Sequence, residues 1–336
     1  MLVRHSLAVA CMVTLTIPLG VRAEAGRYEL KDGKWTAVVA PAEGTAAGEA
    51  ALIRQYVELG KPRKALKAVK KFLKRYRDDK AREEVLLLAG QASIDRGRLY
   101  KAFEWFEQQL SEFPAGQYSA QALERDYEIA GQFLDGRKRV VAGIFRLPAR
   151  EEGLDILTRI TEHVPGSALA QKAMLRIADD YYSREEWPEA ADAYDHYVKS
   201  FRRTGEVQFA SLRAARAMYA SFKGVDYDDT PLIDAQQRFR SFAAAYPEGA
   251  RKANVSRTLK EIHGLRAEKV FQTARFYERT GRHSAAVFSY RQVVDSYPLT
   301  DFAEPARDAL VRLGASPAGE LPDRQDATTR QIRVEQ

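Results

Sequence analysis

The chain has 336 residues, of which 45% are hydrophobic and 29% charged, and this composition is typical of a folded protein rather than a disordered one. Its 53 Lys and Arg residues against 46 Asp and Glu residues give a formal net charge of +7. The single cysteine, Cys11, excludes a disulfide framework and a cysteine-based zinc site. No apolar run reaches the roughly 18 residues that a membrane-spanning helix needs.

The first 23 residues have the pattern of a secretory signal peptide. Arg4 precedes an apolar stretch over residues 7–19, and Val21–Ala23 forms a cleavage site of the small-x-small type. The sequence around Cys11 loosely resembles a lipobox, so lipidation of Cys11 is the alternative to an ordinary residue of the signal core. We therefore expect the chain to be exported, and cleavage leaves a mature chain without cysteine.

One frame of residues recurs along the chain. An alanine is followed by an aromatic residue and then by a proline at Ala102, Phe106 and Pro114, at Ala235, Phe239 and Pro247, and at Ala286, Tyr290 and Pro298. A glycine precedes the alanine of the frame at Gly60, Gly97 and Gly281. The small residue allows two helices to cross closely, the glycine ends the first helix, and the proline stops the second. These offsets are those of the tetratricopeptide repeat.

The spacing of the frame predicts an all-α, tetratricopeptide-like α-solenoid of about six helix pairs. The pairs are expected near Ala47–Arg77, Ala81–Phe113, Tyr118–His163, Leu169–Phe201, Val207–Tyr246 and Val255–Tyr297. A C-terminal helix over residues 301–313 would cap the stack with a polar outer face. No alternation of apolar and polar residues is long enough to suggest a sheet.

These elements divide the chain into five segments. They are a signal peptide over residues 1–23, a flexible leader over 24–48, N-terminal repeats over 49–163, C-terminal repeats over 164–314 and a disordered tail over 315–336. The leader and the tail are assigned because their Pro, Gly and charged residues follow no helical period.

The basic residues are concentrated in one predicted helix. Nine basic residues and no acidic one lie between Lys61 and Arg77. Removal of the signal takes away Arg4 and Arg22, so the mature charge is +5, and without this helix the rest of the chain carries −4. One stripe of the helix consists of Lys64, Lys67, Lys71 and Lys74. A solvated outer face explains this stripe, contact with anionic lipid or an acidic partner is the functional alternative, and nucleic acid is disfavoured because no stacking aromatic residues accompany the lysines.

A second basic stretch, Arg137–Arg150, interrupts the third helix pair. It also contains the apolar residues Val140, Val141, Ile144 and Phe145. A long insertion in a repeat array forms either a loop, often on the binding side, or an extension of a helix whose apolar residues pack. Both interpretations remain open at this point.

The sequence lacks the residue patterns of catalysis. The histidines of the mature chain have no pair at the spacing of a helical zinc site, and they are His163, His196, His263 and His283. The cluster Asp226–Asp229 lacks the glycine and the glutamate that complete a calcium loop. There is no Gly-rich phosphate loop and no nucleophile elbow. We therefore expect a protein that is not an enzyme and that holds no cofactor or metal.

Several segments of the C-terminal half stand in a characteristic order. They are Val164–Ser167, Ala178–Tyr182, Asp228–Pro231, Arg266–Lys269 and Val293–Thr300. With their spacing, residues 162–314 resemble BamD, the tetratricopeptide component of the outer-membrane β-barrel assembly machinery. The resemblance implies a non-enzymatic periplasmic scaffold at the inner face of the outer membrane.

The resemblance also implies partners. In that family the C-terminal repeats dock on a periplasmic domain of the barrel insertase, and the N-terminal repeats meet unfolded outer-membrane proteins. The helix over Arg266–Tyr277 would accordingly face the insertase. The family normally starts with a lipidated cysteine, whereas this sequence has no convincing lipobox. The alternative function is that of a generic cell-envelope adaptor in cell-wall or envelope-integrity complexes.

The first helices of the pairs line a concave groove in such a solenoid, and an extended or helical segment of a partner fits there. Counted from the repeat frame, the candidate partner-binding residues are Lys172, Asp179, Tyr182, Glu268, Phe271, Arg275 and Glu278. The resemblance adds Arg266 to this set. Packing between repeats explains Tyr182 and Phe271 equally well.

Overall fold

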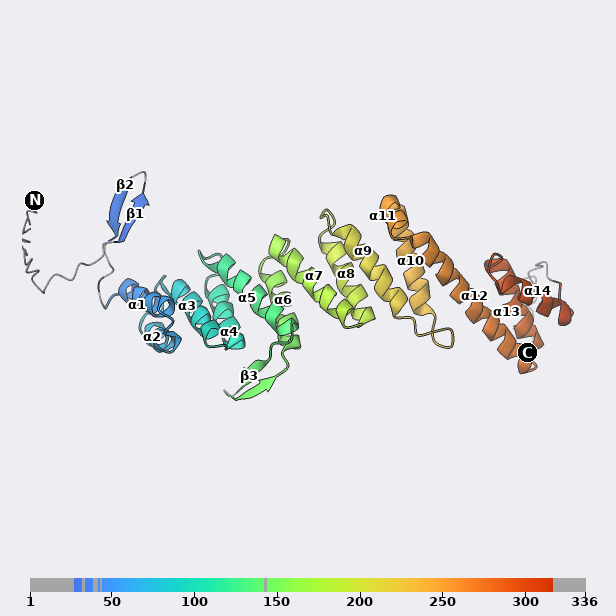
Figure 1. Cartoon of the computed structure of the whole chain (residues 1–336), viewed down its shortest axis with the longest axis horizontal. Helices are drawn as coiled ribbons and strands as arrows, with labels where there is room; N and C mark the ends of the chain where they lie inside the picture. The colour runs from blue at the N-terminus through green and yellow to red at the C-terminus, as the bar shows by residue number, and fades with distance from the viewer. Residues whose placement is uncertain (1–26, 32–33, 39–41, 43, 142–143, 317–336) are drawn as a thin grey trace, which may run out of the picture.

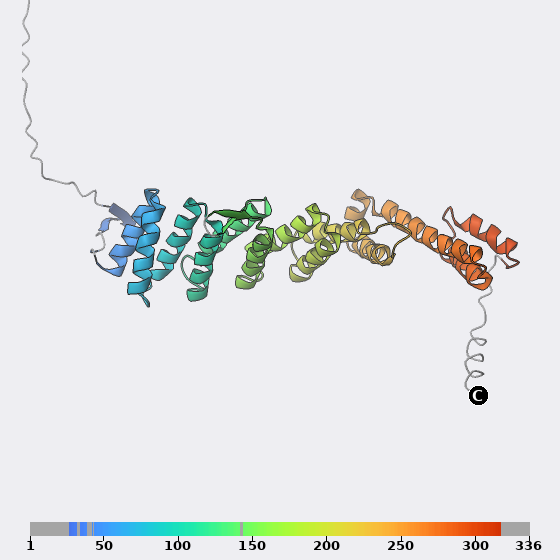
Figure 2. The same ribbon diagram turned by 90° about the horizontal axis from the view of Figure 1, so that it is seen from below.

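The helices follow one another along one long axis, as both views of the ribbon show (Figure 1, Figure 2). The computed structural model describes residues 27–31, 34–38, 42, 44–141 and 144–316. The expected signal peptide with Cys11, and residues 317–336 of the expected tail, lie outside the described residues. Buried side chains form a series of clusters along the array rather than one central core. The predicted all-α, tetratricopeptide-like solenoid is confirmed.

Six helix pairs stand where the repeat frame predicts them. They are α1 (Ala46–Glu58) with α2 (Pro62–Arg75), α3 (Arg82–Asp95) with α4 (Leu99–Glu112), α5 (Ser119–Leu134) with α6 (Arg150–His163), α7 (Ala168–Ser183) with α8 (Trp187–Ser200), α9 (Val207–Ala220) with α10 (Thr230–Ala245), and α12 (Val255–Arg279) with α13 (His283–Ser296). The short α11 (Pro247–Lys252) joins α10 to α12, and α14 (Ala303–Arg312) packs on α13 as the predicted cap. Each second helix packs on the first helix of the next pair.

Two short β-hairpins correct the expectation that the chain contains no strands. β1 (Arg27–Lys31) pairs antiparallel with β2 (Lys34–Val38) inside the expected leader, and β3 (Arg139–Val141) pairs with β4 (Phe145–Leu147) inside the insertion. The insertion is therefore neither an irregular loop nor a helix extension. Strands of three to five residues are too short for a period of two to stand out in a sequence. Helix α1 also begins within the expected leader, where the Thr45 hydroxyl caps it by accepting from the Gly48 amide.

The small residues of the frame lie where the two helices of a pair cross. Ala65, Ala102, Ala190, Ala235 and Ala286 are fully buried. In the second pair, a Cβ placed on Gly90 would lie 2.0 Å from Cε1 of Phe106. Phe106, like the equivalent Tyr194, Phe239 and Tyr290, is at most 2% exposed. The pairs thus depend on a small residue that makes room for a buried aromatic ring.

The turn between α7 and α8 departs from the pattern of the other tight turns. Gly97 and Gly281 occupy the left-handed region there with φ values of 68° and 73°, whereas Glu185 adopts a φ of 61°. A side chain in this region brings its Cβ too close to the following carbonyl oxygen. The fourth pair therefore keeps the turn at the cost of backbone strain.

We expect Gly90→Ala to lower the free energy of unfolding by about 1–3 kcal/mol, because the new methyl group collides with the buried ring of Phe106. Gly131→Ala is the matched control. It also lies inside a helix, but its Cβ would meet no atom within 4 Å, so alanine should stabilise it by roughly 0.5–1 kcal/mol through helix propensity. Thermal denaturation followed by circular dichroism measures both. Equal shifts in the two variants would contradict the packing argument.

We expect Glu185→Gly to raise the free energy of unfolding by about 0.5–1 kcal/mol, since glycine relieves the strain at positive φ but costs more chain entropy. The reverse exchange, Gly281→Glu, should lower it by about 1–2 kcal/mol, because no atom lies near its added Cβ and only the backbone conformation changes. The same melting experiment compares them, and a loss of stability in Glu185→Gly contradicts the strain assignment.

Candidate functional site

The predicted partner-binding residues lie on two first helices, α7 and α12. Lys172, Asp179 and Tyr182 belong to α7, and the other five belong to α12. The structure gathers most of each group around aromatic side chains from neighbouring helices, in two separate clusters. We call them the α7–α9 cluster and the C-terminal pocket.

The α7–α9 cluster links the fourth and fifth helix pairs. Its members are Asp179, Tyr182, Tyr194, Phe209 and Arg213. Asp179 accepts a hydrogen bond from the hydroxyl of Tyr194, whose ring packs edge-on against that of Tyr182 at 6.2 Å. The guanidinium of Arg213 lies 4.3 Å from the ring centroid of Tyr182 and 5.1 Å from that of Phe209. Apart from the contact of Arg213 with Phe209 inside α9, these contacts cross between helices, so the cluster fixes the relative position of α7, α8 and α9.

Tyr194 and Nε of Arg213 are buried in the α7–α9 cluster, whereas Asp179 is exposed. Desolvation and the hydrogen bond to Asp179 raise the pKa of Tyr194, so its hydroxyl remains a donor at neutral pH. Nε of Arg213 is buried and has no hydrogen-bond partner, which leaves stacking on the rings as the main contact of this side chain. The packing interpretation of Tyr182 agrees with these contacts. Lys172 stays exposed and makes no ion pair within the described part of the chain.

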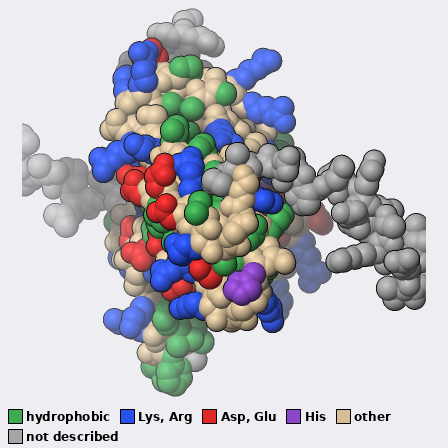
Figure 3. Space-filling model, turned by 90° about the vertical axis from the view of Figure 1, so that its right-hand side faces the viewer, with side chains coloured by type: hydrophobic (Ala, Val, Ile, Leu, Met, Phe, Trp, Pro, Cys, Tyr) green, Lys and Arg blue, Asp and Glu red, His purple; other side chains and the backbone are tan. Residues whose placement is uncertain are grey.

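The C-terminal pocket contains three of the predicted residues, Phe271, Arg275 and Glu278. The remaining lining comes from α13 and α14, namely Tyr290, Glu304, Pro305, Asp308 and Arg312. The ring of Phe271 packs against Tyr290 at 5.6 Å and against Phe302 at 5.5 Å between centroids. Acidic and basic side chains are interspersed at this end of the molecule (Figure 3).

Glu278 is the best-connected charge of the C-terminal pocket. One of its oxygens accepts from the Tyr290 hydroxyl at 2.6 Å, and the other accepts from Nη2 of Arg312 at 3.4 Å. The hydrogen bond from Tyr290, followed by that from Arg312, lowers the pKa of Glu278. Arg275 is exposed at the same pocket. An aromatic wall with both signs of charge is suited to binding a polypeptide segment.

The other two predicted residues of α12 lie outside this pocket. Arg266 is half-buried, and its Nη1 donates to Oε1 of Gln236 at 2.5 Å, which ties α12 to α10. Glu268 is half-buried and forms no ion pair among the residues that the structure describes. Its neighbour Lys269 donates to the carbonyl oxygens of Val225 and Tyr227 and so holds the α9–α10 loop.

The predicted lysine stripe of α2 is exposed. Lys64, Lys67 and Lys71 line a groove beside α1 together with Glu49, Leu52 and Tyr56, whereas Lys74 lies outside it. None of the four lysines forms an ion pair with a carboxylate of the described chain. Over the same residues no group of three His, Cys, Asp or Glu side chains is placed to hold a metal ion, and no helix is long and apolar enough to span a membrane.

Sequence reasoning missed a buried carboxyl in α5. Asp126 is 1% exposed, and its Oδ1 has no hydrogen-bond partner. Burial, with the nearby charge of Glu107, raises the pKa of Asp126 well above its usual range. The sequence of α5 does not indicate that Asp126 is buried. The helix is covered by its neighbours α4 and α6 only in the folded array.

We expect Asp126→Asn to raise the thermal midpoint at about pH 7 and to change it little near pH 4. A carboxyl whose pKa is higher in the folded chain makes the free energy of unfolding fall as the pH rises above the unfolded pKa of about 3.9. The amide removes that loss, which is roughly 1–3 kcal/mol for a buried unpaired group. Asp295→Asn, exposed on α13, is the control for melting curves at both pH values. An equal gain at both would contradict the assignment.

The fold and the repeat frame define a tetratricopeptide solenoid, a class of protein that binds other polypeptides. A model of the YfiO family, described as an outer membrane lipoprotein, matches residues 150–315. The match spans α6 to α14 and so contains both clusters. The predicted resemblance of the C-terminal half to the BamD family is confirmed, and the chain is a BamD-like tetratricopeptide protein.

Several solved structures are similar to the chain. They include the C-terminal part of a TPR repeat-containing protein from Cytophaga hutchinsonii, with 15% identity, a TM-score of 0.33 and coverage of 79% of this chain and 88% of that one. A tetratricopeptide repeat protein from Parabacteroides merdae has 9% identity, a TM-score of 0.33 and coverage of 80% and 98%. PilW, a widely conserved type IV pilus biogenesis factor, has 15% identity, a TM-score of 0.27 and coverage of 79% and 99%. The search of curated proteins gave no match.

Proposed function

We propose that this tetratricopeptide scaffold acts in the assembly of outer-membrane β-barrel proteins, and that it does so without catalysing a reaction. The observation that carries the proposal is the C-terminal pocket, which lies inside the segment that matches an outer membrane lipoprotein family. Its exposed Arg275 and its aromatic wall at Phe271 offer a charged and an apolar contact side by side. Such a combination is typical of the residues that dominate binding at protein interfaces.

The partner that we propose for this pocket is the membrane-proximal periplasmic domain of the barrel insertase. The support is that Arg275 lies within the Arg266–Tyr277 segment that resembles the family, and that Glu278 follows this segment on the same helix. Glu278 is already paired with Tyr290 and Arg312, so it shapes the pocket, whereas Arg275 is free to meet a carboxylate of the partner.

The remaining parts of the proposal concern place and clients. The chain would be exported to the periplasm and work at the inner face of the outer membrane, as the description of the matched family supports. Helices α1 to α5 precede the matched segment and would meet unfolded outer-membrane proteins. The second candidate function is that of an envelope adaptor with a different partner. It is favoured by the fact that α1 to α5 lie outside the matched segment.

We expect Arg275→Glu to weaken retention of the insertase domain by the purified chain at least about tenfold, which corresponds to roughly 1.4 kcal/mol. Arg257→Glu is the matched control, since it makes the same charge change at an exposed site of α12 outside the C-terminal pocket. Co-purification at low and moderate salt, followed by titration, measures the difference.

Two outcomes would move the assignment to the envelope adaptor. One is a failure of the wild-type chain to retain the insertase domain even at low salt, together with normal barrel assembly in cells depleted of the protein. The other is an equal loss of binding in the two arginine variants, because that would show a general charge effect instead of a site.

A further inference from the structure

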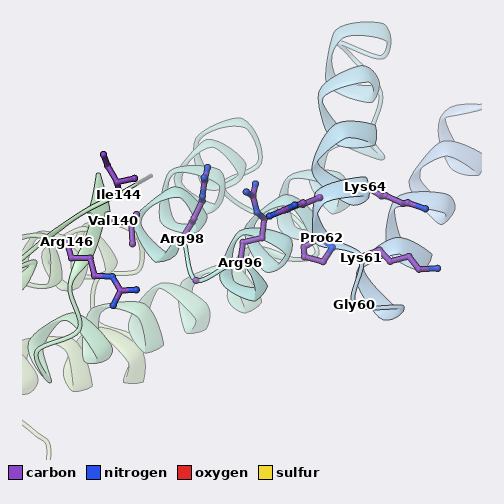
Figure 4. Close-up of a pocket in the computed structure, with 11 residues that line it drawn as sticks. Gly60, Lys61, Pro62, Lys64, Arg96, Arg98, Val140, Ile144 and Arg146 are labelled. Atoms are coloured by element: carbon purple, nitrogen blue, oxygen red, sulfur yellow. The ribbon is translucent and has the colours of Figure 1, made fainter. Parts of the chain in front are cut away.

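A cleft lined only by basic and neutral side chains lies at the N-terminal end of the array, outside the segment that matches the family (Figure 4). Its six basic side chains come from three places in the chain and are Lys61, Arg63, Lys64, Arg96, Arg98 and Arg146. Val140 and Ile144 of the hairpin complete the wall. Arg96 and Arg98 stand between the hairpin on one side and Lys61 and Lys64 on the other (Figure 4).

The repeat geometry explains why these residues meet. Lys61 lies in the turn between α1 and α2, and Arg96 and Arg98 flank the turn between α3 and α4. The hairpin β3–β4 replaces the corresponding turn between α5 and α6. Equivalent turns of successive repeats emerge on the same edge of a solenoid, so the three segments line up there.

The cations of the cleft have no counterions in the part of the chain that the structure covers. None of the six forms an ion pair there, although Arg and Lys residues elsewhere form many. Burial lowers the pKa of Arg96, and the charges of Arg98 and Arg63 lower it further. Mutual repulsion of this kind is relieved when an anion enters the cleft.

The hairpin beside the cleft is fixed at its base. The guanidinium of Arg139 stacks 3.6 Å from the ring centroid of Tyr100 on α4, and its Nη1 pairs with Glu152 on α6 at 2.9 Å. Just after the hairpin, Arg150 pairs with the buried Asp180 at 2.6 Å. These contacts tie the base of the hairpin to α4 and α6.

The hairpin carries apolar side chains into solvent. Ile144 and Phe145 at its far end are 76% and 59% exposed, and Leu147, which pairs with Arg139 at the base, is 50% exposed. The hairpin projects from the row of helices in Figure 1, and a group of hydrophobic side chains protrudes at the corresponding lower end of the molecule in Figure 3. Exposed apolar groups that protrude together, next to unpaired cations, mark a binding surface.

We propose that the hairpin β3–β4 and the basic cleft form a docking surface for a bilayer that contains anionic phospholipid. Ile144 and Phe145 enter the interfacial layer, and the cleft receives the lipid phosphates. A soluble anion would use the cations but not the protruding apolar tip, whereas a membrane surface offers phosphates and hydrocarbon at adjacent depths. This proposal assigns the contact with an anionic surface to the cleft instead of to the lysine stripe of α2. Lys64 belongs to both.

Vesicle sedimentation tests this docking surface. The protein purified after export is mixed with vesicles of phosphatidylcholine alone or with about one-third phosphatidylglycerol, and we expect binding only to the anionic vesicles, weakened by salt. Arg96→Glu with Arg98→Glu should lower the partition coefficient at least about tenfold. Lys67→Glu with Lys71→Glu makes the same charge change on α2 outside the cleft and should lower it much less.

The apolar tip is tested by a second pair of variants. Ile144→Ser with Phe145→Ser should lower binding to anionic vesicles about tenfold or more, because interfacial insertion is lost. Phe276→Ser with Phe288→Ser removes two exposed aromatic side chains at the other end of the array and should leave binding unchanged. All of these positions are exposed or partly exposed, and melting curves verify that each variant is folded.

A direct readout places the tip in the bilayer. Because the chain purified after export is expected to carry no other cysteine, a polarity-sensitive dye on Ile144→Cys labels one site. It should brighten and shift to the blue with anionic vesicles, and the same dye on Phe288→Cys should not. The proposal is overturned by absence of binding to anionic vesicles, by a tip variant that binds like the wild type, or by an α2 variant that loses as much as the cleft variant. These results are independent of insertase binding, which uses the other end of the array.

Discussion

The close approach of two helices at a small residue is the constraint on which the array depends. At Gly90 no side-chain atom beyond hydrogen fits, because the ring of Phe106 occupies the space that a Cβ would need. Gly153 plays the same part in the third pair, where its Cβ would lie 3.1 Å from the carbonyl oxygen of Ala130. Each crossing fixes one pair, and each pair contacts mainly its neighbours, so the shape of the whole solenoid is the sum of local contacts. A displaced crossing would therefore shift every surface that lies beyond it.

The helix pairs could be predicted from the sequence because their determinants are local and periodic. Alanine, aromatic residue, proline and glycine recur at fixed offsets, and each has a single structural role. The fourth pair shows that the turn between the two helices forms even without glycine, since Glu185 adopts the left-handed conformation that glycine adopts in other pairs. The hairpins could not be predicted in the same way. Their few residues carry too little periodicity, and β3–β4 is held by contacts of Arg139 with Tyr100 and Glu152, which are distant in sequence.

The two candidate clusters were predictable only in part, for a related reason. Counting along α7 and α12 identified residues on those helices, such as Asp179 and Glu278, but not the residues that reach them from the next repeat. Arg213 comes from α9 in the next pair, and Arg312 comes from the capping helix α14. The sequence does contain one signal for α9. Phe209 and Arg213 are four residues apart and therefore lie on the same face of this helix, which marks it as a candidate binding helix. Contacts between repeats depend on the superhelical twist, which no single-repeat pattern encodes.

The repetition of the helix pairs also determines which turns lie beside each other at the edge of the array. In a solenoid, turns that are one repeat apart in sequence lie beside each other in space, so charges that are scattered along the chain can form one surface. Lys61 and Arg98 occupy equivalent places in successive repeats, and Arg146 lines the same cleft because the insertion replaces the third turn of the series. The sequence showed a basic helix and a basic insertion as two separate features. The two features form one surface because the insertion is a turn of the repeat, and this surface shares no residue with the C-terminal pocket.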